Sequence, residues 1–317
     1  MNATHFRRLV SLALFAVLLI GGDRLLGWGL DQLTMSSHAR YSRLYRGDEA
    51  AEVVIIGDSR GVHSFYAPAI ADSVGQRTLN LSYNGISTEL AEVVLADYLD
   101  KNEPPRLLVI EVTNFASAPD ALINFKPYFG HSARLRQLFD REQSYTANAM
   151  RLIHLYRFNC ENFLRAAYYL RRDDQNWILR SQMADALIGL TEQQTPAPLS
   201  ESTYTDLNRA ALRRMVQLAD ERGIELRLVV APYWPAHREK LANWPEVTQK
   251  IRDTIGDKHR LWDYSLAISG PTNFADRVHL NLNGAQEFCA RLNRDQFFVT
   301  AADRQPPVSS GAANIRP

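Results

Sequence analysis

One short run of the sequence constrains the fold more than any other, because it joins a buried strand to a polar turn. Val53 to Ile56 are four consecutive β-branched apolar residues, and Gly57, Asp58 and Ser59 follow directly. A continuous apolar run of this length predicts a strand that is buried on both faces of a parallel sheet. Ligand sites in open α/β sheets lie at the carboxyl ends of the strands. The run therefore predicts an α/β fold with the Ser59 hydroxyl at that edge of the sheet.

Apolar runs and helical patterns alternate in two stretches of the chain. Strands are predicted at about 78–81, 107–112, 225–231 and 260–264, and helices at about 88–102, 204–222 and 245–255. This alternation predicts a three-layer α/β/α sandwich with a central, mostly parallel sheet. The segment between these two stretches, at about 116–200, has helical runs and no strand signal, which predicts a helical insertion.

Composition supports one globular domain, with an apolar segment before it and a polar tail after it. We expect an anchor and juxtamembrane stretch at 1–35, an α/β catalytic domain at 36–300 and a disordered tail at 301–317. A chain of 317 residues with 46% hydrophobic residues can form one large core that carries an insertion. The net charge is only +1, so nucleic acid is not an expected partner. Whether Cys160 and Cys289 form a disulfide is left open.

The amino-terminal stretch predicts contact with a membrane. Arg7 and Arg8 precede about 14 uncharged residues at 9–22. This is the length of a cleaved secretory signal peptide, which is one interpretation. In the other, the span continues to about Trp28, where some 20 residues would cover roughly 30 Å. We favour this uncleaved anchor because small residues suited to a cleavage site are poorly placed around 20–22. The positive-inside rule then leaves Arg7 and Arg8 in the cytoplasm and the following domain outside.

A second motif near the other end of the chain completes a candidate catalytic triad. Asp276 and His279 form an Asp-x-x-His pattern. A serine hydroxyl is a poor nucleophile until a base takes its proton. His279 could be that base for Ser59, and Asp276 could orient the imidazole. The alternative is that Gly-Asp-Ser is only a strand-to-helix turn in which Asp58 or Ser59 caps the helix, and that His279 is a surface residue.

The residues around His279 and Ser59 add two further expectations. Asn283 and Gln286 resemble a cap and its third helical residue, which predicts a helix that begins at about Gly284. His63, four residues after Ser59, could face solvent or form a wall of the site. The other histidines have no metal-ligand spacing, so no metal and no cofactor is expected.

Four blocks in this order resemble those of the SGNH (GDSL-type) hydrolase superfamily. They are Gly57-Asp58-Ser59, the segment Asn80-Leu81-Ser82-Tyr83-Asn84-Gly85, Asn114 after the predicted strand 107–112, and Asp276 with His279. The third block departs from the family pattern, because Val112 and Phe115 stand where a Gly and an Asp are usual. The resemblance implies a flavodoxin-like fold in which Ser59, His279 and Asp276 are catalytic. It also implies an oxyanion hole formed by the N–H groups of Ser59 and Gly85 and the side chain of Asn114.

An anchor followed by such a domain is similar to one branch of the superfamily, which includes the alginate acetylation enzymes and the teichoic acid D-alanylation protein. That branch implies a single-pass protein of the bacterial inner membrane with its catalytic domain in the periplasm. It implies O-acetyl transfer to an envelope or exported polysaccharide through an acyl-serine. The acyl donor would come through a multispanning membrane-bound O-acyltransferase. The alternatives are a membrane-tethered acylesterase or deacetylase and a non-catalytic polysaccharide-binding or assembly protein.

A loop that leaves the predicted strand 225–231 suggests where a substrate binds. Tyr233 and Trp234 could form a stacking face for a sugar ring. Arg238 or Arg60 could bind acidic groups. The alternative is that these side chains only pack the loop.

Overall fold

A parallel sheet of five strands forms the centre of the protein. The computed structural model describes residues 3–113, 119–173, 177–199, 205–301 and 303. The strands are β1 (Val53–Ile56), β2 (Thr78–Asn80), β3 (Leu107–Glu111), β4 (Glu225–Val230) and β5 (Leu261–Asp263). Their order is β2-β1-β3-β4-β5, and each neighbouring pair is parallel. This is the flavodoxin-like order, and it confirms the predicted α/β fold class.

Strand β1 explains why the sheet is covered on both sides. All four of its residues are fully buried. Because successive side chains of a strand point to opposite faces, Val53 and Ile55 join one hydrophobic cluster while Val54 and Ile56 join another. The apolar run therefore contributes to two cores at once, as predicted.

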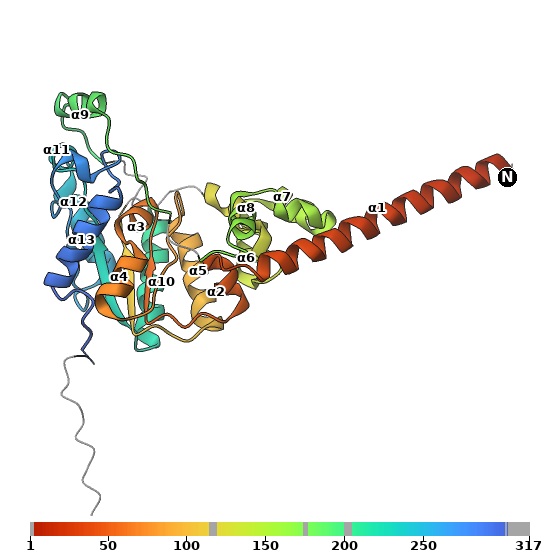
Figure 1. The fold of residues 1–317 in the computed structure, drawn as a ribbon, viewed down its shortest axis with the longest axis horizontal. Coiled ribbons are helices and arrows are strands. Elements are labelled where there is room, and N and C mark those ends of the chain that lie inside the picture. Colours follow the sequence, from red (N-terminus) through yellow and green to blue (C-terminus); the bar gives the residue numbers. More distant parts are fainter. Residues whose placement is uncertain (1–2, 114–118, 174–176, 200–204, 302, 304–317) are drawn as a thin grey trace, which may run out of the picture.

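Helices form the two outer layers. The cluster around Val54 includes side chains of α2 (Arg40–Arg46), α5 (Thr88–Lys101), α10 (Asp206–Glu221) and α12 (Trp244–Ile255). The cluster around Val53 includes side chains of α4 (Ala67–Val74) and α13 (Leu282–Arg294). Figure 1 shows α13 on the side of the body away from α2 and α5. Two short elements follow strand ends: α3 (Ser59–Ser64) after β1 and α11 (Pro235–Arg238) after β4.

Between β3 and α10 the regular elements among the described residues are helices, apart from two isolated bridges. The elements are η1 (Asp120–Tyr128), α6 (Ala133–Glu142), α7 (Ser144–Leu152), η2 (His154–Phe158), α8 (Glu161–Tyr168) and α9 (Asp185–Glu192). Figure 1 shows that α6, α7 and α8 lie beside the base of α1, whereas α9 lies near α11 at the other end of the body. The insertion therefore covers two separate parts of the α/β body. One further short helix, η4 (Pro271–Asn273), precedes the Asp-x-x-His motif.

Helix α1 (Ala3–Met35) projects from this body (Figure 1). Its part from Arg7 to Met35 is long and apolar enough to cross a membrane. Cys160 and Cys289 are both free thiols, which answers the question about a disulfide. Of the predicted disordered tail, residues 302 and 304–317 lie outside the described residues.

Candidate active site

Ser59, His279 and Asp276 form one continuous chain of hydrogen bonds. The Nε2 atom of His279 lies 2.8 Å from the Oγ atom of Ser59. The Nδ1 atom of the same ring lies 2.8 Å from the Oδ2 atom of Asp276. In this geometry the imidazole can take the serine proton while the carboxylate fixes its tautomer. The structure thus brings together the three side chains that the sequence motifs singled out.

The turn between β1 and α3 places Ser59 at the sheet edge. Asp58 caps α3, and its Oδ1 atom accepts a hydrogen bond from the N–H of Arg60 at 2.9 Å. Ser59 is the first helical residue, so its own N–H has no acceptor within the helix and can serve an oxyanion. Gly57 permits this turn, because a Cβ atom there would lie 2.8 Å from the Cβ of Glu111 on β3.

The second block lies against this turn. The side-chain amide of Asn80 donates to the carbonyls of Gly61 and Phe65, both at 2.9 Å, and its oxygen accepts from the N–H of Ser82 at 3.0 Å. The segment therefore lies close to the helix that carries Ser59. Gly85 follows with φ +69°, a left-handed conformation that glycine adopts at little cost. Because β2 is the neighbour of β1, Gly85 lies at the same edge as Ser59. Its role as an oxyanion donor stays a prediction, and Asn114 lies outside the described residues.

The turn that carries Asp276 and His279 is held by the aspartate itself. The Oδ1 atom of Asp276 accepts the N–H groups of Val278 at 2.8 Å and His279 at 2.9 Å. Burial would raise the pKa of Asp276, but the His279 side chain and these N–H groups outweigh it, so the pKa is lowered. The carboxylate is therefore ionised at neutral pH. Side-chain exposures of 19% for His279 and 40% for Asp276 leave the site open to solvent.

The helix after this turn begins earlier than the sequence suggested. Asn281, not Asn283, caps α13, and its Oδ1 atom accepts the N–H of Gly284 at 3.1 Å. Asn281 also donates to the carbonyl of Thr272 at 2.8 Å. The cap therefore connects α13 to η4, a contact that cap spacing alone does not reveal.

His63 is a residue of the site that the sequence left undecided. It is buried, and its ring packs edge-on against the ring of His279, with 5.1 Å between ring centroids. Burial and the nearby His279 lower the pKa of His63 to about 4. At neutral pH it is therefore an uncharged wall beside the catalytic imidazole. Its position one helical turn after Ser59 was the available signal, but nothing in the sequence showed that His279 packs there.

The prediction that Arg60 binds substrate is wrong, because Arg60 is completely buried. Its Nε atom lies 3.5 Å from the Oε1 atom of the buried Glu111, and its Nη2 atom donates to the carbonyl of Ala231. Its guanidinium carbon lies 3.4 Å from the ring centre of Tyr233. Burial raises the pKa of Glu111, and the Arg60 guanidinium opposes that rise. Arg60 therefore connects α3 to the ends of β3 and β4 beneath the site.

The predicted stacking face is also absent. Tyr233 is 1% exposed and Trp234 is 5% exposed. The N–H of Trp234 donates to the carbonyl of Arg277 at 3.1 Å, so this loop supports the turn that carries Asp276. Packing is thus the role of both aromatic side chains. Arg238 is half-buried and stacks on Trp244 at 4.0 Å, and its contact with substrate stays a prediction.

We expect Arg60→Ala to lower the free energy of unfolding by about 3–5 kcal/mol, because it leaves the Glu111 carboxyl buried without its partner. Thermal or urea unfolding of the detergent-solubilised chain measures this change. Arg291→Ala is the matched control, since it removes an exposed ion pair to Asp295 and should cost at most about 1 kcal/mol. Wild-type stability together with a raised KM in Arg60→Ala would restore the substrate-binding role.

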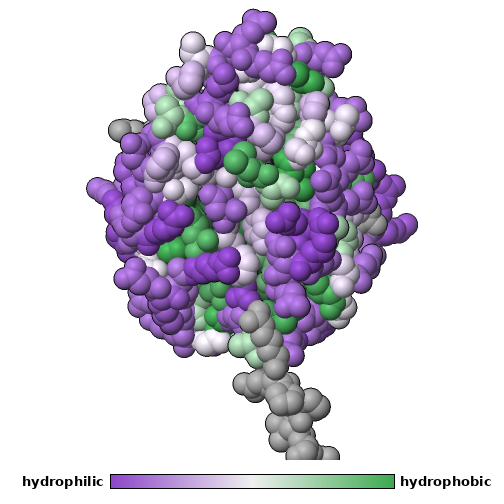
Figure 2. Space-filling model, turned by 90° about the vertical axis from the view of Figure 1, so that its left-hand side faces the viewer, coloured by the Kyte–Doolittle hydropathy of each residue, from purple (hydrophilic) through white to green (hydrophobic). Residues whose placement is uncertain are grey.

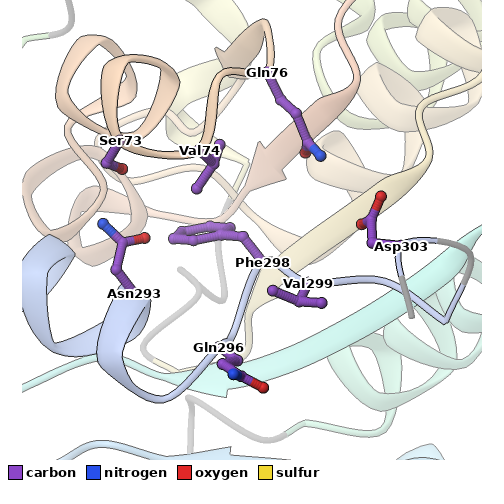
Figure 3. A pocket seen from close by; sticks show the side chains of 8 residues that line it. All are labelled: Ser73, Val74, Gln76, Asn293, Gln296, Phe298, Val299 and Asp303. Carbon is purple, nitrogen blue, oxygen red and sulfur yellow. The ribbon is translucent and has the colours of Figure 1, made fainter. Parts of the chain in front are cut away.

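A cavity of about 360 Å³ lies away from the triad (Figure 3). Its lining residues are Ser73, Val74, Gln76, Asn293, Gln296, Phe298, Val299 and Asp303. Gln76 precedes β2, and Asp303 pairs with Arg106, which precedes β3. The cavity is therefore at the amino edge of the sheet, opposite Ser59. Within the described ranges, no group of three or more His, Cys, Asp or Glu side chains is arranged to hold a metal ion.

Comparisons with known proteins give only distant structural likenesses. No family model and no curated protein matches the sequence. A protein from Bacteroides fragilis described as an acylhydrolase has 12% identity and a TM-score of 0.39, over 79% of this chain and 88% of that one. A Streptococcus protein described as a platelet activating factor has 12% identity and a TM-score of 0.39, over 93% and 99%. An acetyl xylan esterase from Butyrivibrio proteoclasticus has 7% identity and a TM-score of 0.30, over 79% and 65%. At such values the function has to be inferred from the geometry of the site.

Proposed function

We propose that the protein is a serine enzyme that acts on acyl esters through an acyl-serine intermediate. The observation that carries the proposal is the position of His279 between Ser59 and Asp276, with 2.8 Å on each side. His279 takes the proton of Ser59 as Oγ attacks the acyl carbonyl, and it then gives that proton to the leaving oxygen. In the second half, His279 takes a proton from the acceptor hydroxyl as that oxygen attacks the acyl carbonyl, and it returns the proton to Ser59 Oγ when the acyl–Oγ bond breaks.

Within this chemistry, we propose that the acceptor is a hydroxyl of an envelope or exported polysaccharide and that the acyl group is acetyl. Two features support this choice: the four blocks resemble the polysaccharide-acylating branch of the SGNH superfamily, and the domain is joined to a helix able to span a membrane. Arg7 and Arg8, at the start of the apolar part of that helix, favour a single-pass protein of the inner membrane with its catalytic domain outside the cytoplasm. The acyl donor then has to cross the membrane, which a multispanning O-acyltransferase partner would provide.

Hydrolysis is the second candidate, and the exposure of the triad favours it. Asp276 and His279 are both reached by solvent, so water could act as the acceptor in place of a sugar hydroxyl. The protein would then be a membrane-tethered acylesterase or deacetylase. A purely binding role is less favoured, because it would not require the aligned Ser59–His279–Asp276 geometry.

A single assay separates these functions. The full chain in detergent is given an acetyl ester of nitrophenol, with and without neutral and acidic oligosaccharides. Transfer predicts acetylated oligosaccharide in the mass spectrum and faster nitrophenol release as acceptor is added. Hydrolysis predicts free acetate at a rate that does not depend on acceptor. Polysaccharide binding without turnover of the ester would contradict both enzymatic functions.

A further inference from the structure

The base of α1 and the segment after α7 enclose an apolar groove of about 440 Å³. Its lining residues are Leu18, Leu19, Ile20, Gly22, Asp23, Leu26, Leu152, Ile153 and Leu155. Leu152 is 73% exposed and Ile153 is 54% exposed. Large apolar side chains in such positions mark a surface that contacts something other than water.

Asp23 fastens α1 to this segment. Its two carboxylate oxygens accept the backbone N–H groups of His154 at 2.9 Å and Leu155 at 3.0 Å. Gly27 allows close packing one turn further on, because a Cβ atom there would lie 2.7 Å from the Cβ of His154. Residues 152–155 are therefore held at a fixed height along α1. The bonds also satisfy a carboxylate and two backbone N–H groups, as a membrane environment demands.

The length of α1 shows what surrounds this segment. Residues 9–22 precede Asp23, whose carboxylate binds the body, and at 1.5 Å per residue they span only about 21 Å. The hydrocarbon core of a bilayer is about 30 Å thick, and tilting the helix would shorten its reach further. If the core begins beside Arg8, it ends near Trp28, about 8 Å beyond Asp23. Residues 152–155 then lie within the hydrocarbon.

The distribution of apolar side chains supports this placement. Five of the nine large hydrophobic residues that are exposed outside α1, among the described residues, lie within 145–168: Tyr145, Leu152, Ile153, Leu164 and Tyr168. Figure 1 shows α7 and α8 beside the base of α1. The opposite face of the body is mostly hydrophilic (Figure 2). The molecule is therefore apolar where a bilayer around α1 would meet it.

We propose that residues 152–155 insert into the membrane leaflet on the side of the catalytic body, and that lipid acyl chains fill the groove against α1. The insertion depends on α1 spanning the membrane, as in the proposed function, but not on any acyl-transfer chemistry. Asp23 and the inserted segment hold the body at a fixed height and orientation. The distance of Ser59 from the bilayer is then fixed, whereas a flexible linker between α1 and the body would let it vary.

Spin labelling of the full chain in phosphatidylethanolamine–phosphatidylglycerol vesicles tests this proposal. In a Cys160→Ser, Cys289→Ala background, Leu152→Cys carries the label, and Ile153→Cys gives an independent measurement. Gln249→Cys is the control, because Gln249 is exposed on α12. Power saturation compares the accessibility of each label to oxygen, which concentrates in lipid, with its accessibility to a water-soluble nickel complex.

We expect the labels at 152 and 153 to favour oxygen and the label at 249 to favour nickel. Circular dichroism identical to that of the parent chain confirms that each variant is folded. If the labels at 152 and 153 in folded protein favour nickel as strongly as the control, the insertion is wrong and the segment faces water. Low accessibility to both reagents would also contradict the insertion and would indicate that a protein partner rather than lipid covers the groove. This readout does not involve catalysis, so failure of the insertion leaves the proposed reaction untouched.

Discussion

Ser59→Ala is expected to lower kcat for acyl-ester cleavage on the order of 10⁶-fold, because it removes the atom that forms the acyl bond. The fold should survive, since among the described residues the Ser59 hydroxyl bonds to other groups of the site, His279 at 2.8 Å and Asp58 at 3.4 Å. Steady-state kinetics on an acetyl ester, with thermal unfolding measured in parallel, checks both statements.

Ser64→Ala is the matched control for this substitution. Ser64 lies on the same short helix and is buried, but among the described residues its hydroxyl makes no hydrogen bond, whereas that of Ser59 bonds to His279. Its kcat should stay within about a factor of ten of wild type. A Ser59→Ala protein that keeps wild-type kcat would remove Ser59 as the nucleophile.

His279→Ala should lower kcat almost as far as Ser59→Ala, whereas Asp276→Asn should lower it about 10⁴-fold. Asparagine can still accept the N–H groups of Val278 and His279 through its Oδ1 atom, so the turn is preserved. Its amide NH₂ would replace the Oδ2 atom that faces Nδ1 of His279. The NH₂ group would then face the Nδ1–H donor, or His279 would have to adopt the other tautomer, in which Nε2 carries the proton and cannot take one from Ser59. The loss in Asp276→Asn thus reports orientation of the imidazole rather than collapse of the turn.

The same kinetic assay compares the two variants. His38→Ala is the control for loss of an imidazole, because the His38 side chain is half exposed and pairs with the exposed Asp173. Near wild-type kcat in His279→Ala would assign the base elsewhere. His63, whose ring lies 5.1 Å from that of His279, would then be the next candidate.

Features that depend on local pattern could be predicted from the sequence. The β-branched run 53–56 is a strand because its side chains can be buried on both faces. The alternation of strands and helices gives the parallel sheet, because parallel neighbours need a crossover. Ser59 and the Asp276–His279 pair each sit in a short motif, and order along the chain was enough to relate them.

The predictions that failed concern residues whose environment depends on contacts between distant segments. A guanidinium next to Ser59 could bind substrate or a buried carboxylate, and only the approach of β3 brings Glu111 to Arg60. Tyr233 and Trp234 follow a strand, but Tyr233 is buried against Arg60 and Trp244 and Trp234 against the turn that carries Asp276. The sequence indicated Asn283 as the cap, whereas Asn281 caps α13 and also contacts η4. The edge-on contact of His63 has the same origin, since its partner is 216 residues away in sequence.

The most direct test of the central claim is covalent labelling of Ser59 by a fluorophosphonate, followed by peptide mass mapping. Such a reagent reacts with a serine hydroxyl whose proton a neighbouring base can take, so it reports activation without any choice of substrate. We predict one adduct, on the peptide that contains Ser59, with no labelling in Ser59→Ala and strongly slowed labelling in His279→Ala. An unlabelled wild-type protein, or an adduct on another residue at undiminished rate in Ser59→Ala, would contradict the account.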